Sequence, residues 1–124
     1  MTICISEPYA GSDIRRILTS ATLGADGIWR VTGEKCWISF GSHDLAERIG
    51  HCILAQTSPA PGVRGLSLFL VPDRAATGEP KGVALRRTEE KMGLHGSPTC
   101  AIGLRMSRQP CLQRRGPASN TCSA

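Results

Sequence analysis

Residues 17–32 read Ile17-Leu-Thr-Ser-Ala-Thr-Leu-Gly-Ala-Asp-Gly-Ile-Trp-Arg-Val-Thr32. Every second residue from Ile17 to Leu23 falls on one side of an extended chain, as in a half-buried strand. Asp26-Gly27 follows, and this dipeptide favours a tight hairpin because both residues tolerate positive φ. The stretch therefore predicts two antiparallel strands, at residues 17–23 and 28–32, joined by a short turn.

Working outward, the rest of the chain has the same character. Gly and Pro together make up 22 of the 124 residues, above the usual share of roughly an eighth, which favours turns over long helices. A further turn is expected at Gly33-Glu34. Five more strands are expected at residues 35–40, 49–56, 66–71, 83–87 and 99–104. We predict an all-β fold, a small antiparallel barrel or sandwich of about seven short strands.

Composition and charge exclude several classes of protein. The net charge is +5, but residues 1–104 carry 11 basic and 10 acidic side chains, and the remaining excess lies after residue 104. Since a nucleic-acid footprint needs basic residues gathered on one face, we expect no nucleic-acid partner. No apolar run approaches the ~20 residues of a membrane span, so no span is expected.

The cysteines and histidines do not indicate a metal or redox site. No pair of cysteines has the C-x-x-C spacing, and the three histidines lack metal-ligand spacing. No signal-peptide h-region is present, so we expect reduced, partly buried thiols and no bound metal. The cysteines are Cys4, Cys36, Cys52, Cys100, Cys111 and Cys122.

Two segments carry residues suited to a ligand. The first is Cys4-Ile-Ser-Glu-Pro-Tyr-Ala-Gly-Ser-Asp13, where glycine allows close approach of a ligand and two serines offer hydroxyls. The second is Gly33-Glu-Lys-Cys-Trp-Ile-Ser-Phe-Gly41, where Trp37 offers a flat apolar face and Ser39 lies on the same side two residues later. By itself, the first segment also fits an ordinary turn, and the second also fits a core tryptophan beside a surface serine.

Together the two segments resemble the double signature of the acyl-CoA dehydrogenase middle domain. The stretch Arg64-Gly-Leu-Ser-Leu-Phe-Leu-Val-Pro72 resembles the long core strand of that family, and Glu90-Lys-Met-Gly-Leu-His-Gly-Ser-Pro-Thr-Cys100 resembles the following loop and strand. The resemblance covers residues 2–104 in unbroken order. It implies a fragment of an FAD-dependent enzyme that dehydrogenates acyl-CoA thioesters between the α and β carbons.

The resemblance also implies roles for particular residues. The first segment would wrap the flavin, with Ile5 and Ser6 at the isoalloxazine edge, and the strand around Trp37 would flank the ring. The implied FAD-binding residues are Cys4, Ile5, Ser6, Trp37, Ile38 and Ser39. The implied acyl-CoA contacts are Gly11 and Ser12. Glu7 we expect to order its turn rather than to act as a catalytic base.

The chain also departs from the family. We expect the helical domains that lie on either side in the family to be absent here. Because the resemblance implies that one of them supplies the glutamate that removes the α-proton, no catalytic residue is assigned and the chain alone is expected to be inactive. The complete enzyme implied is a homo-oligomer. We expect residues 1–104 to form the middle domain without its last strand. Residues 105–124 are expected to be an irregular tail, which we interpret as a frame-shifted reading.

Other functions stay open from the sequence. One is a non-catalytic β-module that binds flavin or CoA, another is an inactive pseudogene product, and a third is an acyl-CoA oxidase, which shares this domain. A bacterial cytoplasm fits the thiols and the lack of a targeting signal. A mitochondrial or peroxisomal location also stays open, because truncation would remove a transit peptide.

Overall fold

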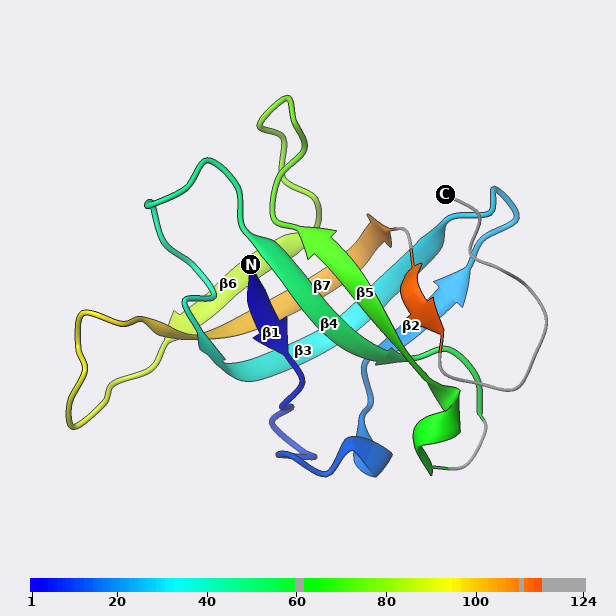
Figure 1. Ribbon diagram of the computed structural model, residues 1–124, viewed down its shortest axis with the longest axis horizontal. Coiled ribbons are helices and arrows are strands. Elements are labelled where there is room, and N and C mark those ends of the chain that lie inside the picture. Colours follow the sequence, from blue (N-terminus) through cyan, green and yellow to red (C-terminus); the bar gives the residue numbers. More distant parts are fainter. Residues whose placement is uncertain (60–61, 110, 115–124) are drawn as a thin grey trace.

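The computed structural model describes residues 1–59, 62–109 and 111–114, and within them the chain forms strands and two short 3-10 helices (Figure 1). The predicted all-β class is confirmed. The strands are β1 (Thr2–Cys4), β2 (Ser20–Leu23), β3 (Trp29–Ser39), β4 (Gly50–Gln56), β5 (Leu66–Pro72), β6 (Val83–Thr88), β7 (Thr99–Gln109) and β8 (Cys111–Arg114), and the 3-10 helices are η1 (Ile14–Arg16) and η2 (Gly62–Gly65).

The strands form one folded sheet in the order β6-β7-β3-β2-β4-β5-β8, with β1 beside β4. Only one residue pair, Ser20 with Gln56, joins β2 to β4. The sheet bends at this point, so that β4 and β5 pass over β3 and β7 (Figure 1). The result is sandwich-like rather than a closed barrel. It is also mixed, because β1 and β2 both run parallel to β4.

The core lies between the two halves of the folded sheet. Alternating residues of β5 point inward, as expected for a strand with one face against a core. Their partners come from β1, β2, β3, β4 and β7. The buried cluster comprises Cys4, Ala21, Val31, Ile38, Ile53, Ala55, Phe69, Val71, Cys100, Ile102 and Leu104. The cysteines whose side chains the structure describes (Cys4, Cys36, Cys52 and Cys100) are all buried free thiols, as predicted.

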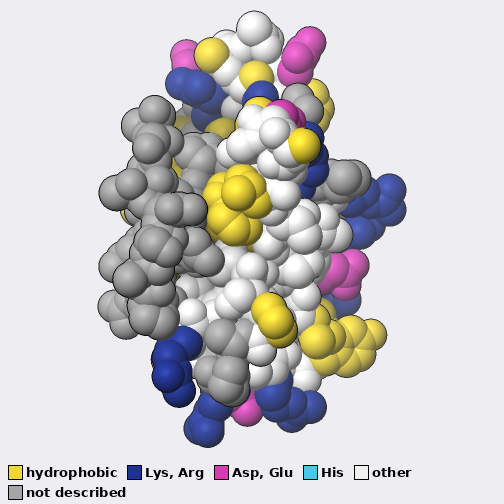
Figure 2. Space-filling view, turned by 90° about the vertical axis from the view of Figure 1, so that its right-hand side faces the viewer, with side chains coloured by type: hydrophobic (Ala, Val, Ile, Leu, Met, Phe, Trp, Pro, Cys, Tyr) yellow, Lys and Arg dark blue, Asp and Glu magenta, His cyan; other side chains and the backbone are white. Residues whose placement is uncertain are grey.

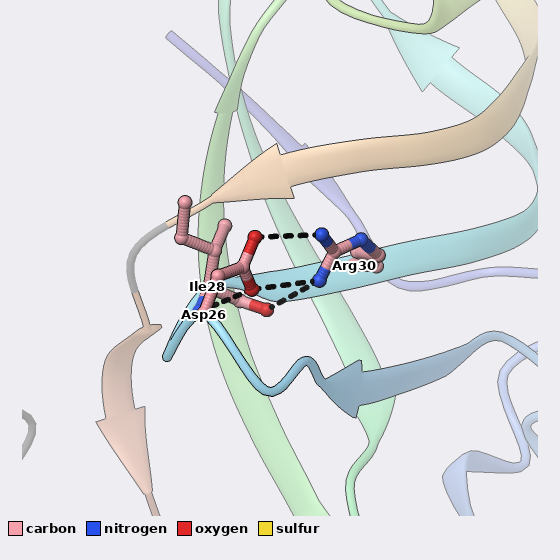
Figure 3. Close-up of polar contacts among 3 residues, drawn as sticks. All are labelled: Asp26, Ile28 and Arg30. Atoms are coloured by element: carbon pink, nitrogen blue, oxygen red, sulfur yellow. Dashed lines mark hydrogen bonds and ion pairs between the residues drawn. The ribbon is translucent and has the colours of Figure 1, made fainter.

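The predicted hairpin at Asp26-Gly27 joins β2 to β3 and is closed by an ion pair (Figure 3). The Arg30 guanidinium donates to both carboxylate oxygens of Asp26, at 3.0 and 2.7 Å, and to the carbonyl of Ile28 at 3.2 Å. Gly24 leaves room for this arrangement, since a Cβ there would lie 1.8 Å from Nη1 of Arg30. This arrangement of the Asp26–Arg30 ion pair therefore depends on glycine at position 24.

The prediction of a turn at Gly33-Glu34 is wrong. β3 runs through this residue, and only its register with β7 shifts, between Val31 and Gly33. A Cβ on Gly33 would lie 2.8 Å from the Cα of Thr19, so the glycine serves a close backbone approach instead of a turn. The tail was expected to be irregular from residue 105, but residues 105–109 belong to strand β7.

β7 continues to Gln109 and pairs there with Trp29 of β3, while β8 pairs with β5. Residues 105–109 and 111–114 therefore lie in strands. The rest of the expected tail, residues 110 and 115–124, lies outside the described residues. Whether the tail is a frame-shifted reading stays a prediction. No helix in the described part is long and apolar enough to cross a membrane.

Surface charge is dispersed on the face that Figure 2 shows. Lys and Arg side chains stand there in separate groups, with acidic and hydrophobic side chains between them. The described residues on this face make no continuous basic stripe of the kind that tracks a nucleic-acid backbone.

Candidate functional site

The first motif leaves the sheet at the end of β1 and forms a tight turn. The amide of Gly11 donates to the carbonyl of Glu7 at 2.8 Å, and the amide of Glu7 donates back to the carbonyl of Gly11 at 3.2 Å. Gly11 has a φ of +55°, which favours glycine, and a Cβ there would meet only open space. Gly11 and Ser12 are therefore exposed at the tip of this turn.

The second motif contains a β-bulge. Lys35 pairs with Ile102 of β7 and Ile38 pairs with Cys100, so Cys36 and Trp37 together face a single residue of β7. Bulges of this kind redirect side chains and are common beside binding sites. Here the bulge turns the Trp37 side chain outward, where it is 60% exposed, with a φ of +60°.

Hydrogen bonds join the two motifs, although about thirty residues separate them. The Cys36 amide, which the bulge frees from β7, donates to the Ser6 carbonyl at 3.0 Å. On β1, just before the first motif, the Thr2 hydroxyl donates to the Ser39 carbonyl at 2.8 Å. The first motif thus lies along the outer end of β3, and Ser6 is held beside the bulge that carries Trp37.

A buried ion pair lies beneath this junction. Nζ of Lys35 lies 2.9 Å from Oε1 of Glu7, and the side chains are 0% and 3% exposed. The same ammonium donates to the carbonyl of Ile5 at 3.1 Å. The Glu7 carboxylate also accepts from the amides of Leu18 (2.7 Å) and Thr19 (3.0 Å). Every oxygen of Glu7 is therefore occupied by a donor, as a buried carboxylate requires.

These contacts set the ionisation of the pair. Burial by itself raises the pKa of the Glu7 carboxyl, but the hydrogen bonds from Thr19, Lys35 and Leu18 outweigh it and hold that pKa below its usual value. Burial lowers the pKa of Lys35, and the attraction of Glu7 opposes this change. The expectation that Glu7 orders its turn agrees with these bonds. No role was predicted for Lys35 from the sequence, although it lies within the second motif.

The predicted flavin residues divide into two groups. Trp37, Ser39 and Ile5 are exposed and Ser6 is half-buried, so their side chains are available to a ligand. Cys4 and Ile38 are 0% and 2% exposed and belong to the core. The side chains of these two residues therefore point away from the site, and only their backbones remain for a ligand contact.

The exposed group fits a planar heteroaromatic ring. The Trp37 indole supplies an open apolar face, and the hydroxyls of Ser6 and Ser39 come from the segments that flank it. The group lies on an open surface. A cavity of about 250 Å³ lies elsewhere, at the edge of the sandwich, and is lined by residues that include His51 and Asp73. A ring that packs on Trp37 would therefore need a second surface to cover it.

His51 lies in the interior, beside Cys4. It is 1% exposed, and its Nδ1 lies 3.8 Å from Sγ of Cys4. Burial lowers the pKa of His51, and burial raises the pKa of the Cys4 thiol to about 12. Both groups are therefore neutral near pH 7, and the pair lacks the thiolate that a reactive cysteine needs.

The structure thus shows a β-domain with an exposed tryptophan at a β-bulge beside a Ser-Glu-Pro turn. Residues 2–106 match the family described as acyl-CoA dehydrogenase, middle domain. The chain belongs to the acyl-CoA dehydrogenase family. It is 44% identical over 108 residues to the 3-methylmercaptopropionyl-CoA dehydrogenase of Ruegeria pomeroyi, a match that covers 82% of this chain and 18% of that protein.

Solved structures agree with this assignment. Butyryl-CoA dehydrogenase from Megasphaera elsdenii superposes with a TM-score of 0.77 at 27% identity, covering 93% of this chain and 28% of that one. The acyl-CoA dehydrogenase of Bacillus anthracis, solved in complex with FAD, gives a TM-score of 0.68 at 28% identity, over 87% of this chain and 16% of that one. The chain thus spans less than a third of the length of each of these relatives.

Proposed function

We propose that this chain is the flavin- and thioester-holding part of an acyl-CoA dehydrogenase, the enzyme class that oxidises acyl-CoA thioesters between the α and β carbons. The observation that carries the proposal is the exposed Trp37 at the bulge of β3. Its neighbour Cys36 donates a backbone hydrogen bond to Ser6 of the first motif. The match of residues 2–106 to the middle-domain family supports it.

The residues would divide the work as follows. Trp37 packs against the isoalloxazine ring of FAD, and the hydroxyls of Ser6 and Ser39 bond its polar edge. Gly11 and Ser12 contact the acyl-CoA from the exposed turn. FAD, when bound, accepts the hydride, and the protein holds and orients it. We assign no proton-abstracting base to this chain. That group belongs to a helical domain, and the active enzyme is a homo-oligomer that contains such domains, in the cytoplasm of bacteria.

FAD titration tests the proposal. The purified chain is titrated with FAD while flavin fluorescence and absorbance are followed, and saturable binding is expected. Replacing Trp37 by Ala should weaken binding by roughly tenfold, the equivalent of about 1.4 kcal/mol, because the indole face is lost. Leu23→Ala is the matched control. Leu23 is an exposed apolar residue paired with Trp29 at the other end of β3.

The outcomes separate an enzyme part from a binding module and from an inactive product. Saturable binding that depends on Trp37 and not on Leu23 supports the proposal. No saturable binding by the wild-type chain counts against a flavin-holding module. Co-expression with helical-domain segments then distinguishes an enzyme part from a binding module. Only the former should give flavin that is bleached by an acyl-CoA under anaerobic conditions.

A further inference from the structure

Trp37 has a backbone conformation that large side chains rarely adopt. Its φ is +60°, in the left-handed region where Cβ crowds the backbone. Such outliers persist only where the surrounding structure over-determines them, and they cluster at ligand sites. Since the side chain itself is mostly exposed, packing of the indole does not hold the conformation. The cause has to lie in the backbone on either side of the residue.

The residues just before Trp37 supply that cause. The Cys36 amide is bonded to the Ser6 carbonyl, and Nζ of Lys35 is bonded to the Ile5 carbonyl and to Glu7. Three bonds thus connect residues 5–7 to residues 35–36. On the other side of the tryptophan, Ile38 returns to the core and pairs with Cys100. Trp37 is therefore the residue that closes the gap between two anchored segments.

We propose that Glu7 and Lys35 are positioning residues. Their buried ion pair clamps the first motif onto the bulge of β3, and this clamp holds Trp37 in its outward, left-handed conformation beside Ser6 before any ligand binds. The identity of the ligand as FAD rests on the proposed function, whereas the clamp itself does not. Because the ring-binding surface is formed in advance, binding does not have to include the entropy cost of ordering that surface.

A contribution to folding stability does not by itself account for the buried Glu7–Lys35 ion pair. Burying an ammonium and a carboxylate carries a desolvation cost that apolar side chains of similar size avoid. Lys35 is nevertheless the largest of the fully buried side chains, and the backbone bonds of its ammonium and of Glu7 all go to the first motif and to Leu18 and Thr19 just after η1. The pair therefore determines where the first motif lies relative to β3.

The test uses Trp37 itself as the probe. The chain has two tryptophans, so Trp29→Phe leaves Trp37 as the one remaining tryptophan, with an aromatic ring kept against Phe69. In this background the double variant Glu7→Gln with Lys35→Met removes both charges at similar size. The measurements are near-ultraviolet circular dichroism and acrylamide quenching of Trp37, with far-ultraviolet circular dichroism as the check of folding.

A matched control lies on the same strand. The Asp26–Arg30 pair bridges the hairpin at the opposite end of β3 (Figure 3). The double variant Asp26→Asn with Arg30→Met removes it in the same background. We expect the Glu7/Lys35 variant to stay folded but to lose most of the near-ultraviolet signal of Trp37. We expect the control to keep that signal. FAD affinity should fall by about tenfold in the first variant only, because the surface must then be ordered on binding.

Two results would overturn the inference. One is a folded Glu7/Lys35 variant with the wild-type Trp37 signal, and the other is an equal loss of signal in the Asp26/Arg30 control. If the double variant does not fold, Glu7→Gln alone, which keeps the size and one oxygen acceptor, is judged by the same criteria. Failure of the wild-type chain to bind FAD would contradict the proposed function, but the Trp37 signal would still decide whether the clamp exists.

Discussion

The rings of Trp29 on β3 and Phe69 on β5 lie 5.6 Å apart between centroids, inclined at 59°. This tilted contact crosses from one half of the folded sheet to the other. It matters because β2 and β4 are joined by a single residue pair, so side-chain packing rather than a continuous ladder holds the two halves together. Phe69 has no exposed surface, and Val71 of the same strand is also fully buried.

Removing the Phe69 ring should weaken the fold strongly. Phe69→Ala is expected to lower the free energy of unfolding by about 3–5 kcal/mol, since it loses the burial of the ring and leaves a cavity. Urea unfolding followed by far-ultraviolet circular dichroism measures the loss. Phe40→Ala is the control, because Phe40 is 37% exposed and should lose much less. Equal losses in the two variants would contradict a core centred on Phe69.

Breaking the buried ion pair on one side should cost more than removing both partners. Lys35→Met leaves the Glu7 carboxylate buried without its counter-charge, and we expect a loss of about 3–5 kcal/mol. The double change of Glu7→Gln with Lys35→Met should lose less, because no unpaired charge remains. The comparison is a double-mutant cycle in urea. A double variant as unstable as the sum of both single variants would show that the two side chains do not act as a pair.

The stability of the chain should be greatest between about pH 6.5 and 9. His51 has a folded pKa below its usual 6.5 because of burial, so the unfolded chain binds the proton more readily and stability falls as pH drops below 6.5. Cys4 has a folded pKa of about 12 against a usual 9.0, so the unfolded chain ionises first and stability falls as pH rises above 9. Thermal unfolding across pH 4.5–11 measures both limbs.

Single substitutions assign the two limbs. His51→Gln should flatten the dependence between pH 4.5 and 6.5 and leave the alkaline limb unchanged. Cys4→Ala should make the alkaline limb shallower without removing it, because burial also raises the pKa of Cys36 and of Cys52. The loss of the buried sulfur lowers stability at every pH. Glu7, whose folded pKa is also lowered, adds a further loss only as pH falls below about 4.5. An unaltered acid limb in His51→Gln would contradict the assignment.

Gly33 should tolerate no side chain. A Cβ there would lie 2.8 Å from both Cα and Cβ of Thr19, and the φ of +154° disfavours other residues. We expect Gly33→Ala to destabilise the fold by more than about 1 kcal/mol. Gly93→Ala is the control, because a Cβ at Gly93 meets nothing within 4 Å. Equal unfolding midpoints for the two variants would show that the approach of Thr19 is not restrictive.

Local patterns were enough for the strands whose residues alternate or whose turns are distinctive. The hairpin at Asp26-Gly27 and the apolar strands β4 and β5 follow from turn chemistry and hydrophobic runs, which act over a few residues. β1 was not predicted, because it pairs in parallel with β4, some fifty residues away. Its three residues carry no pattern of their own.

The candidate site shows the same division. The resemblance of the two motifs to the family implied a flavin site, which stays a prediction, and the structure places Ser6 beside the strand of Trp37. The side-chain directions could not be predicted, because a strict alternation would put Lys35, Trp37 and Ser39 on one face. The bulge breaks that alternation, so that Lys35 points into the core and Trp37 points out.

The sequence by itself determined the all-β class, the hairpin at Asp26-Gly27 and the family, because these depend on composition, turn residues and motif order. Only the tertiary structure decided the folding of the sheet over itself, the continuation of β3 through Gly33 and the burial of Lys35 against Glu7. The physical reason is that an ammonium is stable inside a protein only where a distant segment brings a carboxylate and carbonyls to it, and no pattern within one strand contains that information.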